Sequence, residues 1–235
     1  MFLLRLRETL HFFWQHMTEL LWRLIPVLLP LLVYSNYRLL AIHHGDPEKA
    51  VTDPLTLLPQ MLGGVAATAF TIVYTLRVLQ AGNAPLPGLV PLWRDAARGF
   101  PALLAVQLLA GVAVVAGLLL LILPGIYLLG ALLPAYVIAV QETYSPIAAL
   151  KASWTRFRAQ AWALSICILL LLPGLLVVLG GLGALEQLLN DTPEPVRILA
   201  MSMLDMVATL FAQLLGILLV RFYVLEDKTG EASVA

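Results

Sequence analysis

Charged residues and cysteine are both scarce in this chain, and each scarcity excludes a class of protein. Only 12% of the 235 residues are charged and the formal net charge is zero, so no nucleic-acid partner is predicted. The single cysteine, Cys167, excludes an intramolecular disulfide and a cysteine-based metal site. The sequence also lacks a Gly-rich phosphate loop, a G-x-S-x-G elbow and an H-E-x-x-H zinc motif.

Metal-type side chains gather in one short segment, where His43 and His44 precede Asp46 and Glu48. Adjacent histidines in a loop diverge, and no third ligand follows at helical spacing. We therefore expect no metal, no cofactor and no enzymatic activity.

Apolar residues are abundant instead. They make up 61% of the chain, against about 45–50% in a soluble domain, and they fall into runs of roughly the 20 residues that a helix needs to cross a bilayer. The sequence predicts an all-α, polytopic integral membrane protein, with residues 1–225 as one six-span domain and 226–235 as a polar tail. The expected transmembrane helices cover about 19–42, 57–79, 101–123, 125–140, 161–183 and 196–222. Pro124-Gly125 is the turn signal between the third and the fourth.

Basic residues are distributed unequally among the connections. The loops 43–56 and 185–197 carry one Lys or Arg each, whereas the connections 77–99 and 141–160 carry three each. Basic residues are retained on the cytoplasmic side of a membrane. Both termini and the tail are therefore predicted to be cytoplasmic, which agrees with an even number of crossings.

The segment 146–160 has the pattern of an amphipathic helix that lies in the headgroup plane. Ser145 suits its N-cap and Pro146 its first turn. Apolar residues, including Trp154 and Phe157, recur at three- and four-residue steps, and basic residues fall elsewhere. We expect three cations to meet anionic phospholipid headgroups and the two aromatic rings to insert; the residues are Lys151, Arg156, Arg158, Trp154 and Phe157.

Two other segments carry Trp and Arg before an apolar run. Together with 146–160 they predict a threefold repeat of an interfacial helix followed by a two-span hairpin. One is "VPLWRDAARGFPALL", which adds Trp93, Arg94 and Arg98 to the expected lipid contacts, and the other is "LRLRETLHFFWQHMTEL". The alternative is that any membrane protein places Trp and Arg where its helices enter lipid.

Ionisable residues inside a bilayer are costly and mark candidate sites. Arg38 and Asp205 lie at comparable depth near the outer ends of the first and sixth spans, which predicts an intramembrane ion pair. Alternatively, Arg38 reaches outward to water and Asp205 faces a wet crevice. Glu142 ends the fourth span, where the helix dipole disfavours an anion; the candidate partners are Arg77, Arg94 and Arg98.

The stretch "LPGIYLLGALLPAYVIAVQETYSPIAALKASWTRF" resembles the YciC-like family of bacterial inner-membrane proteins. It is also similar to the membrane domain attached to some glycerophosphodiester phosphodiesterases. The shared positions are Pro124, Gly125, Glu142, Pro146, Ala149, Leu150, Lys151, Ser153 and Trp154. The resemblance implies a multi-pass protein of the bacterial inner membrane. It also implies a structural hinge that couples a span to its interfacial helix, formed by Pro124, Gly125, Glu142, Ser145 and Pro146.

Two classes of function follow from these features. The first is a non-enzymatic inner-membrane protein of envelope or lipid homeostasis, which handles lipids or scaffolds an envelope protein partner. The second is a transporter or channel for a small or lipid-like solute, favoured by prolines expected to break helices at Pro26, Pro30 and Pro173. An intramembrane enzyme ranks below both.

Overall fold

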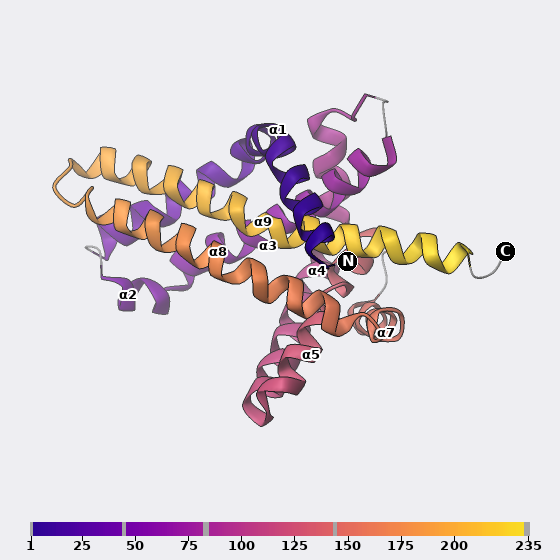
Figure 1. The fold of residues 1–235 in the computed structure, drawn as a ribbon. Helices are drawn as coiled ribbons and strands as arrows, with labels where there is room; N and C mark the ends of the chain where they lie inside the picture. The colour runs from indigo at the N-terminus through magenta and orange to yellow at the C-terminus, as the bar shows by residue number, and fades with distance from the viewer. Residues whose placement is uncertain (1, 44–45, 82–84, 143–144, 233–235) are drawn as a thin grey trace. The chain divides into compact units, whose positions relative to one another are not determined.

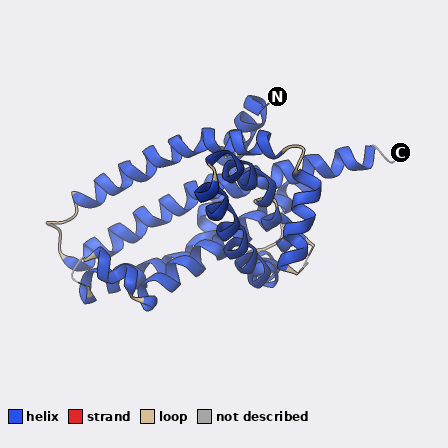
Figure 2. Cartoon of the chain, turned by 90° about the horizontal axis from the view of Figure 1, so that it is seen from below, coloured by secondary structure: helices blue, strands red, loops and turns tan. Residues whose placement is uncertain are grey.

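The computed structural model describes residues 2–43, 46–81, 85–142 and 145–232, and throughout these ranges the ordered elements are helices (Figure 2). In chain order the elements are α1 (Phe2–Tyr37), η1 (Arg38–Ile42), α2 (Pro47–Thr52), α3 (Pro54–Ala81), α4 (Leu89–Leu120), α5 (Ile122–Leu132), α6 (Ala135–Gln141), α7 (Pro146–Phe157), α8 (Ala161–Gln187) and α9 (Glu194–Ala232) (Figure 1). The element η1 is a short π-helix. The expected polar tail at 226–235 is helical as far as Ala232, as part of α9.

Six helical segments in the described ranges are long and apolar enough to cross a membrane. They are Leu6–Ile42, Pro54–Ala81, Leu89–Leu120, Ile122–Gln141, Ala161–Gln187 and Glu194–Val224. The fourth combines α5 and α6, which are separated by a turn at Leu133 and Pro134. The prediction of an all-α, six-span membrane protein is confirmed.

The chain forms two compact units, whereas the sequence predicts one six-span domain. Unit 1 contains Met1–Trp14, Thr68–Leu172 and Leu214–Ala235, and unit 2 contains Gln15–Ala67 and Pro173–Gln213. Each unit is built from segments that are distant in the sequence, so each is held together by tertiary packing.

In unit 1, α4 packs along α5 and α6, and α7 packs against all three. The shared core contains six fully buried side chains: Val106, Ala135, Ile138, Ala139, Ala149 and Phe157. Small residues permit the close approach. A Cβ atom built on Gly99 would lie 2.9 Å from Val140 Cα, and one on Gly117 would lie 3.0 Å from Gly125 Cα. Contacts between small residues are the usual means by which membrane helices pack tightly.

The chain reverses between α4 and α5 at Leu121, three residues before the expected Pro124-Gly125 turn. Leu121 is extended, with φ −159° and ψ 137°, and its N–H donates to the Gly117 carbonyl at 3.0 Å. Pro124 instead lies in the first turn of α5, where a missing N–H breaks no helical hydrogen bond. The turn therefore lies three residues earlier than predicted, because the first turn of α5 accommodates Pro124.

Prolines do not interrupt the helices at the predicted places. α1 continues through Pro26 and Pro30, and α8 continues through Pro173. The two segments expected to form separate interfacial helices before the first and third spans are continuous with α1 and α4. Of the three expected interfacial helices, α7 stands alone as a separate element, so the threefold repeat stays a prediction.

Candidate functional site

Helix α7 begins as its sequence predicts. The Ser145 hydroxyl accepts a hydrogen bond from the Ala148 N–H at 3.3 Å, and Pro146 occupies the first turn. The cap satisfies a backbone donor that the helix itself leaves free. It fixes where α7 starts and therefore which residues lie on each of its faces.

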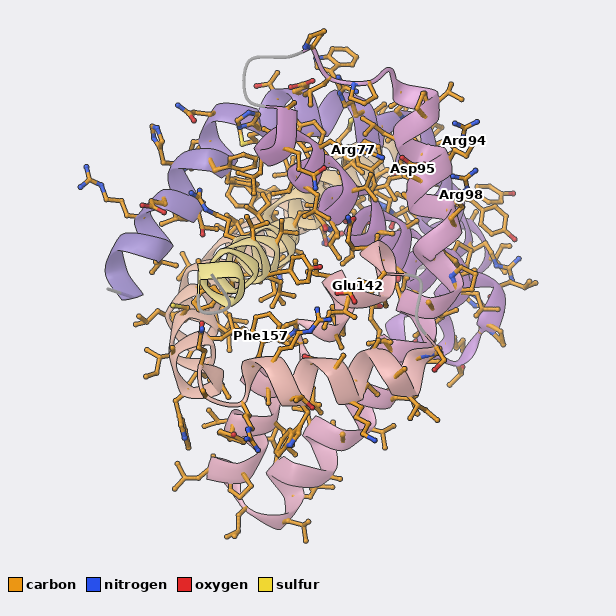
Figure 3. The ribbon with its side chains drawn as sticks, turned by 90° about the vertical axis from the view of Figure 1, so that its right-hand side faces the viewer. Arg77, Arg94, Asp95, Arg98, Glu142 and Phe157 are labelled. Carbon is orange, nitrogen blue, oxygen red and sulfur yellow. The ribbon has the colours of Figure 1, made fainter. Side chains whose placement is uncertain are left out.

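The buried face of α7 differs from the predicted apolar face. Ala149, Ser153 and Phe157 are buried at four-residue spacing, and the Ser153 hydroxyl donates to the Ala131 carbonyl at 2.7 Å. Phe157, expected to insert into lipid, is 1% exposed and belongs to the core of unit 1 (Figure 3). The prediction for Phe157 was wrong because small residues, not only large apolar ones, define the packing face.

The opposite face of α7 is an exposed stripe of four residues, which we call the α7 stripe. Ile147, Lys151, Trp154 and Arg158 follow at steps of four, three and four, and all are exposed. Two cations therefore alternate with two apolar side chains on a single line. This is the composition of a helix face at a lipid headgroup layer, where the apolar groups enter lipid and the cations meet phosphate.

Two further aromatic rings adjoin the α7 stripe. The Tyr127 ring of α5 lies 5.7 Å from the Trp154 ring in an edge-on arrangement and 5.7 Å from the Trp162 ring. The Tyr127 hydroxyl also donates to the Arg158 carbonyl at 3.0 Å. The edge-on contact with Tyr127 and this hydrogen bond hold Trp154 and the end of α7 in a defined position.

Glu142 binds Arg156 rather than the arginines predicted from the sequence. Arg156 Nη1 lies 2.6 Å from Glu142 Oε1 and Nη2 lies 3.2 Å from Oε2, and the Tyr223 hydroxyl donates to Oε1 at 3.1 Å. The paired contact ties the end of α6 to α7 and compensates the anion at a helix C-terminus. Arg156 thus has a structural role, and its predicted headgroup contact stays a prediction.

The arginines proposed as partners of Glu142 have other positions. Arg77 Nη2 donates to Asp95 Oδ2 at 2.9 Å, and Arg98 Nη1 lies 3.5 Å from Asp95 Oδ1. Arg77 and Arg98 thus share the Asp95 carboxylate, and Arg94 and Arg98 are exposed on α4 (Figure 3). Trp93 stacks on Phe70 with ring centroids 4.6 Å apart. This second basic segment therefore exposes Arg94 and Arg98, while Trp93 packs into unit 1.

In unit 2, Arg38 binds Asp53 and not Asp205. Two nitrogens of Arg38 donate to Asp53 Oδ2, Nη2 at 2.7 Å and Nε at 3.1 Å. His43 Nε2 lies 2.9 Å from the same oxygen. The π-helix η1 explains this arrangement, because its i→i+5 hydrogen bonds place Arg38 and His43 one turn apart. The predicted Arg38–Asp205 ion pair is replaced by this network. His44 lies outside the described residues.

Asp53→Asn is expected to lower the apparent melting temperature of the solubilised protein by a few degrees, on the order of 2–4 °C. The variant leaves Arg38, which is only 16% exposed, without its carboxylate partner. Hydrogen bonds from Arg38, His43 and Thr56 hold the pKa of Asp53 well below its usual range. A lowered carboxyl pKa stabilises the fold fully above the unfolded value of about 4, and this stabilisation declines as the pH falls below it.

Thermal unfolding should therefore separate wild type from Asp53→Asn at both about pH 7 and about pH 5, and the two should converge only below about pH 4. Glu48→Gln, at an exposed position on α2, is the matched control and should leave the melting temperature unchanged. Convergence already between pH 7 and pH 5 would contradict the role of the Asp53 carboxylate.

Asp205 is bound by an amide. Asn36 Nδ2 donates to Asp205 Oδ2 at 2.7 Å and lies 3.2 Å from Ser202 Oγ, whose hydroxyl donates to the Ile198 carbonyl at 2.7 Å. Asn36 and Ser202 are buried. The sequence pointed to Asp205 through its place in an apolar run, but the roles of Asp53, Ser202 and Tyr223 depend on tertiary contacts that no local pattern marks.

The fold and these surfaces define a multi-pass helical membrane protein. Comparison with protein-family models, with curated proteins and with solved structures finds no match to this chain.

Proposed function

We propose that the chain is a non-enzymatic inner-membrane protein of envelope or lipid homeostasis, and that its α7 stripe binds anionic phospholipid headgroups at the cytoplasmic face. The α7 stripe is the observation that carries this proposal, because it exposes Lys151 and Arg158 beside Trp154. Each such cation near an anionic surface contributes about 1 kcal/mol to lipid binding.

The location is supported by two features of the sequence. The connection that contains α7 is rich in basic residues, as cytoplasmic connections are. The segment from Pro124 to Trp154 resembles the YciC-like proteins of the bacterial inner membrane. Both features support cytoplasmic termini and an inner-membrane location for this chain.

Replacing both cations of the stripe, Lys151→Gln with Arg158→Gln, should weaken binding of phosphatidylglycerol by roughly 30-fold, since about 2 kcal/mol of attraction is removed. Binding of zwitterionic phosphatidylcholine should stay unchanged. Native mass spectrometry of the protein in mixed micelles, titrated with either lipid, measures both affinities.

Lys49→Gln, an exposed cation in the connection predicted to lie on the other side of the membrane, is the control. It should retain wild-type binding of phosphatidylglycerol. Equal loss in the control and the double variant, or no loss in the double variant, would overturn the proposal. A co-purifying protein subunit with no retained lipid would instead favour the scaffold function.

A transporter or channel is the second candidate function. The continuous helices at Pro26, Pro30 and Pro173 remove the argument from broken helices. The intramembrane carboxylate of Asp205 is the observation that favours this candidate.

A further inference from the structure

The carboxylate of Asp205 lies within an apolar helix and has an uncharged partner. Asp205 is part of the candidate span Glu194–Val224, and Asn36, whose amide donates to it at 2.7 Å, is part of Leu6–Ile42. An anion in such a place is costly unless a cation or a proton neutralises it.

The cation closest to Asn36 in the sequence is engaged elsewhere. Arg38 gives two N–H groups to Asp53. His43 also meets Asp53. Arg38, His43 and Asp53 thus form a network of their own, which leaves Asp205 outside it.

Among the described residues Asp205 has no cationic partner, and the group bound to it is the neutral Asn36 amide. Glu186 of α8 repels Asp205, and both residues belong to unit 2. Two carboxyl groups that repel one another in an apolar environment favour a state in which one of them holds a proton. A proton on Asp205 would remove both this repulsion and the cost of a charge in an apolar span.

Asn36 can serve Asp205 in both protonation states. Its Nδ2–H group donates to the carboxylate, and after a half-turn of the amide its Oδ1 can accept the O–H of the protonated acid. Ser202, 3.2 Å from Asn36 Nδ2, offers a hydroxyl oxygen to the amide. A π-helix, an element often found at functional sites, follows two residues after Asn36.

We infer that Asp205, Asn36 and Ser202 form a proton-binding site within the membrane. The carboxylate takes a proton from water to become the neutral acid, and it returns that proton to water on deprotonation, so no other reactant is needed. This inference is independent of lipid binding by α7, and it gives the second candidate function a proton as its coupling ion.

Infrared difference spectroscopy during a pH titration of the protein in lipid nanodiscs tests the site. Wild type should show the carbonyl band of a protonated carboxylic acid that titrates between about pH 4 and pH 9, the range spanned by ordinary and buried carboxyl groups. Asp205→Asn should remove this band. A band of unchanged amplitude in Asp205→Asn, or no titrating band in wild type, would overturn the inference.

Two further variants test the neighbours of Asp205 without removing it. Asn36→Leu removes the donor to the carboxylate, so the band should persist to a pH higher by about one unit or more. Glu186→Gln removes the repulsion, so the band should disappear at a lower pH than in wild type. Unchanged titration in both variants would show that the titrating acid is not at this site.

Discussion

Gly130→Ala is expected to destabilise unit 1 by roughly 3 kcal/mol, although it adds a single methyl group. A Cβ atom at this position would collide with the Ala161 carbonyl and with Ser165 Oγ. Both are on α8, and the Ser165 hydroxyl already donates to the Ile126 carbonyl of α5 at 2.6 Å. α5 and α8 would have to separate, and overpacked sites of this kind cost about 1–3 kcal/mol.

Equilibrium unfolding by denaturant in mixed micelles measures the loss. Gly111→Ala is the matched control, since the same change on α4 meets no atom within 4 Å. It should be neutral or should stabilise the protein by up to about 1 kcal/mol, the difference in helix propensity between alanine and glycine. Equal effects of the two substitutions would show that α5 and α8 do not pack as closely as the structure places them.

Phe157→Ala is expected to be the second severe change, with a loss of about 3–5 kcal/mol in the free energy of unfolding. The ring is 1% exposed and lies in the core that joins α4, α6 and α7, with Val106 and Ile138 among its members. Its removal leaves a cavity that the surrounding helices fill only in part.

Comparing Trp154→Ala with Phe157→Ala distinguishes the exposed face of α7 from its buried face. Trp154 is 39% exposed and touches the Tyr127 ring, so its loss should cost much less stability than that of Phe157. Unfolding measurements and lipid titrations on both variants check this contrast. A larger loss of stability for Trp154→Ala than for Phe157→Ala would reverse the assignment of the two faces of α7.

Hydropathy was sufficient to predict the helical class, the six spans and the start of α8 at Ala161, because crossing a bilayer requires long apolar runs. It was insufficient for the faces of α7. Ala149 and Ser153 look unremarkable in a hydropathy profile, yet they are fully buried because small side chains allow helices to approach closely. The cap at Ser145 was predictable because it depends on neighbouring residues alone.

Partners of charged residues were harder to predict than the charges themselves. Arg38 and Glu142 stand out in the sequence as ionisable groups at the ends of spans. The π-helical turn η1 places the Arg38 side chain where it binds Asp53. Arg156, which binds Glu142, lies on α7, the helix that follows α6. Neither the π-helix nor the contact across the connection has a local sequence signature.

The reversal at Leu121 affects how the hairpin of α4 and α5 responds to changes in bilayer thickness. Residues 118–126 contain no charged or aromatic side chain, and Leu119 to Leu123 are exposed at the tip formed by α4 and α5. Anchors such as Trp, Tyr, Lys and Arg fix the depth of a segment at the headgroups. Without such anchors, the tip of this hairpin can change its depth as the bilayer thickens or thins. α7 and its neighbours can then keep a constant depth at the other surface of the bilayer.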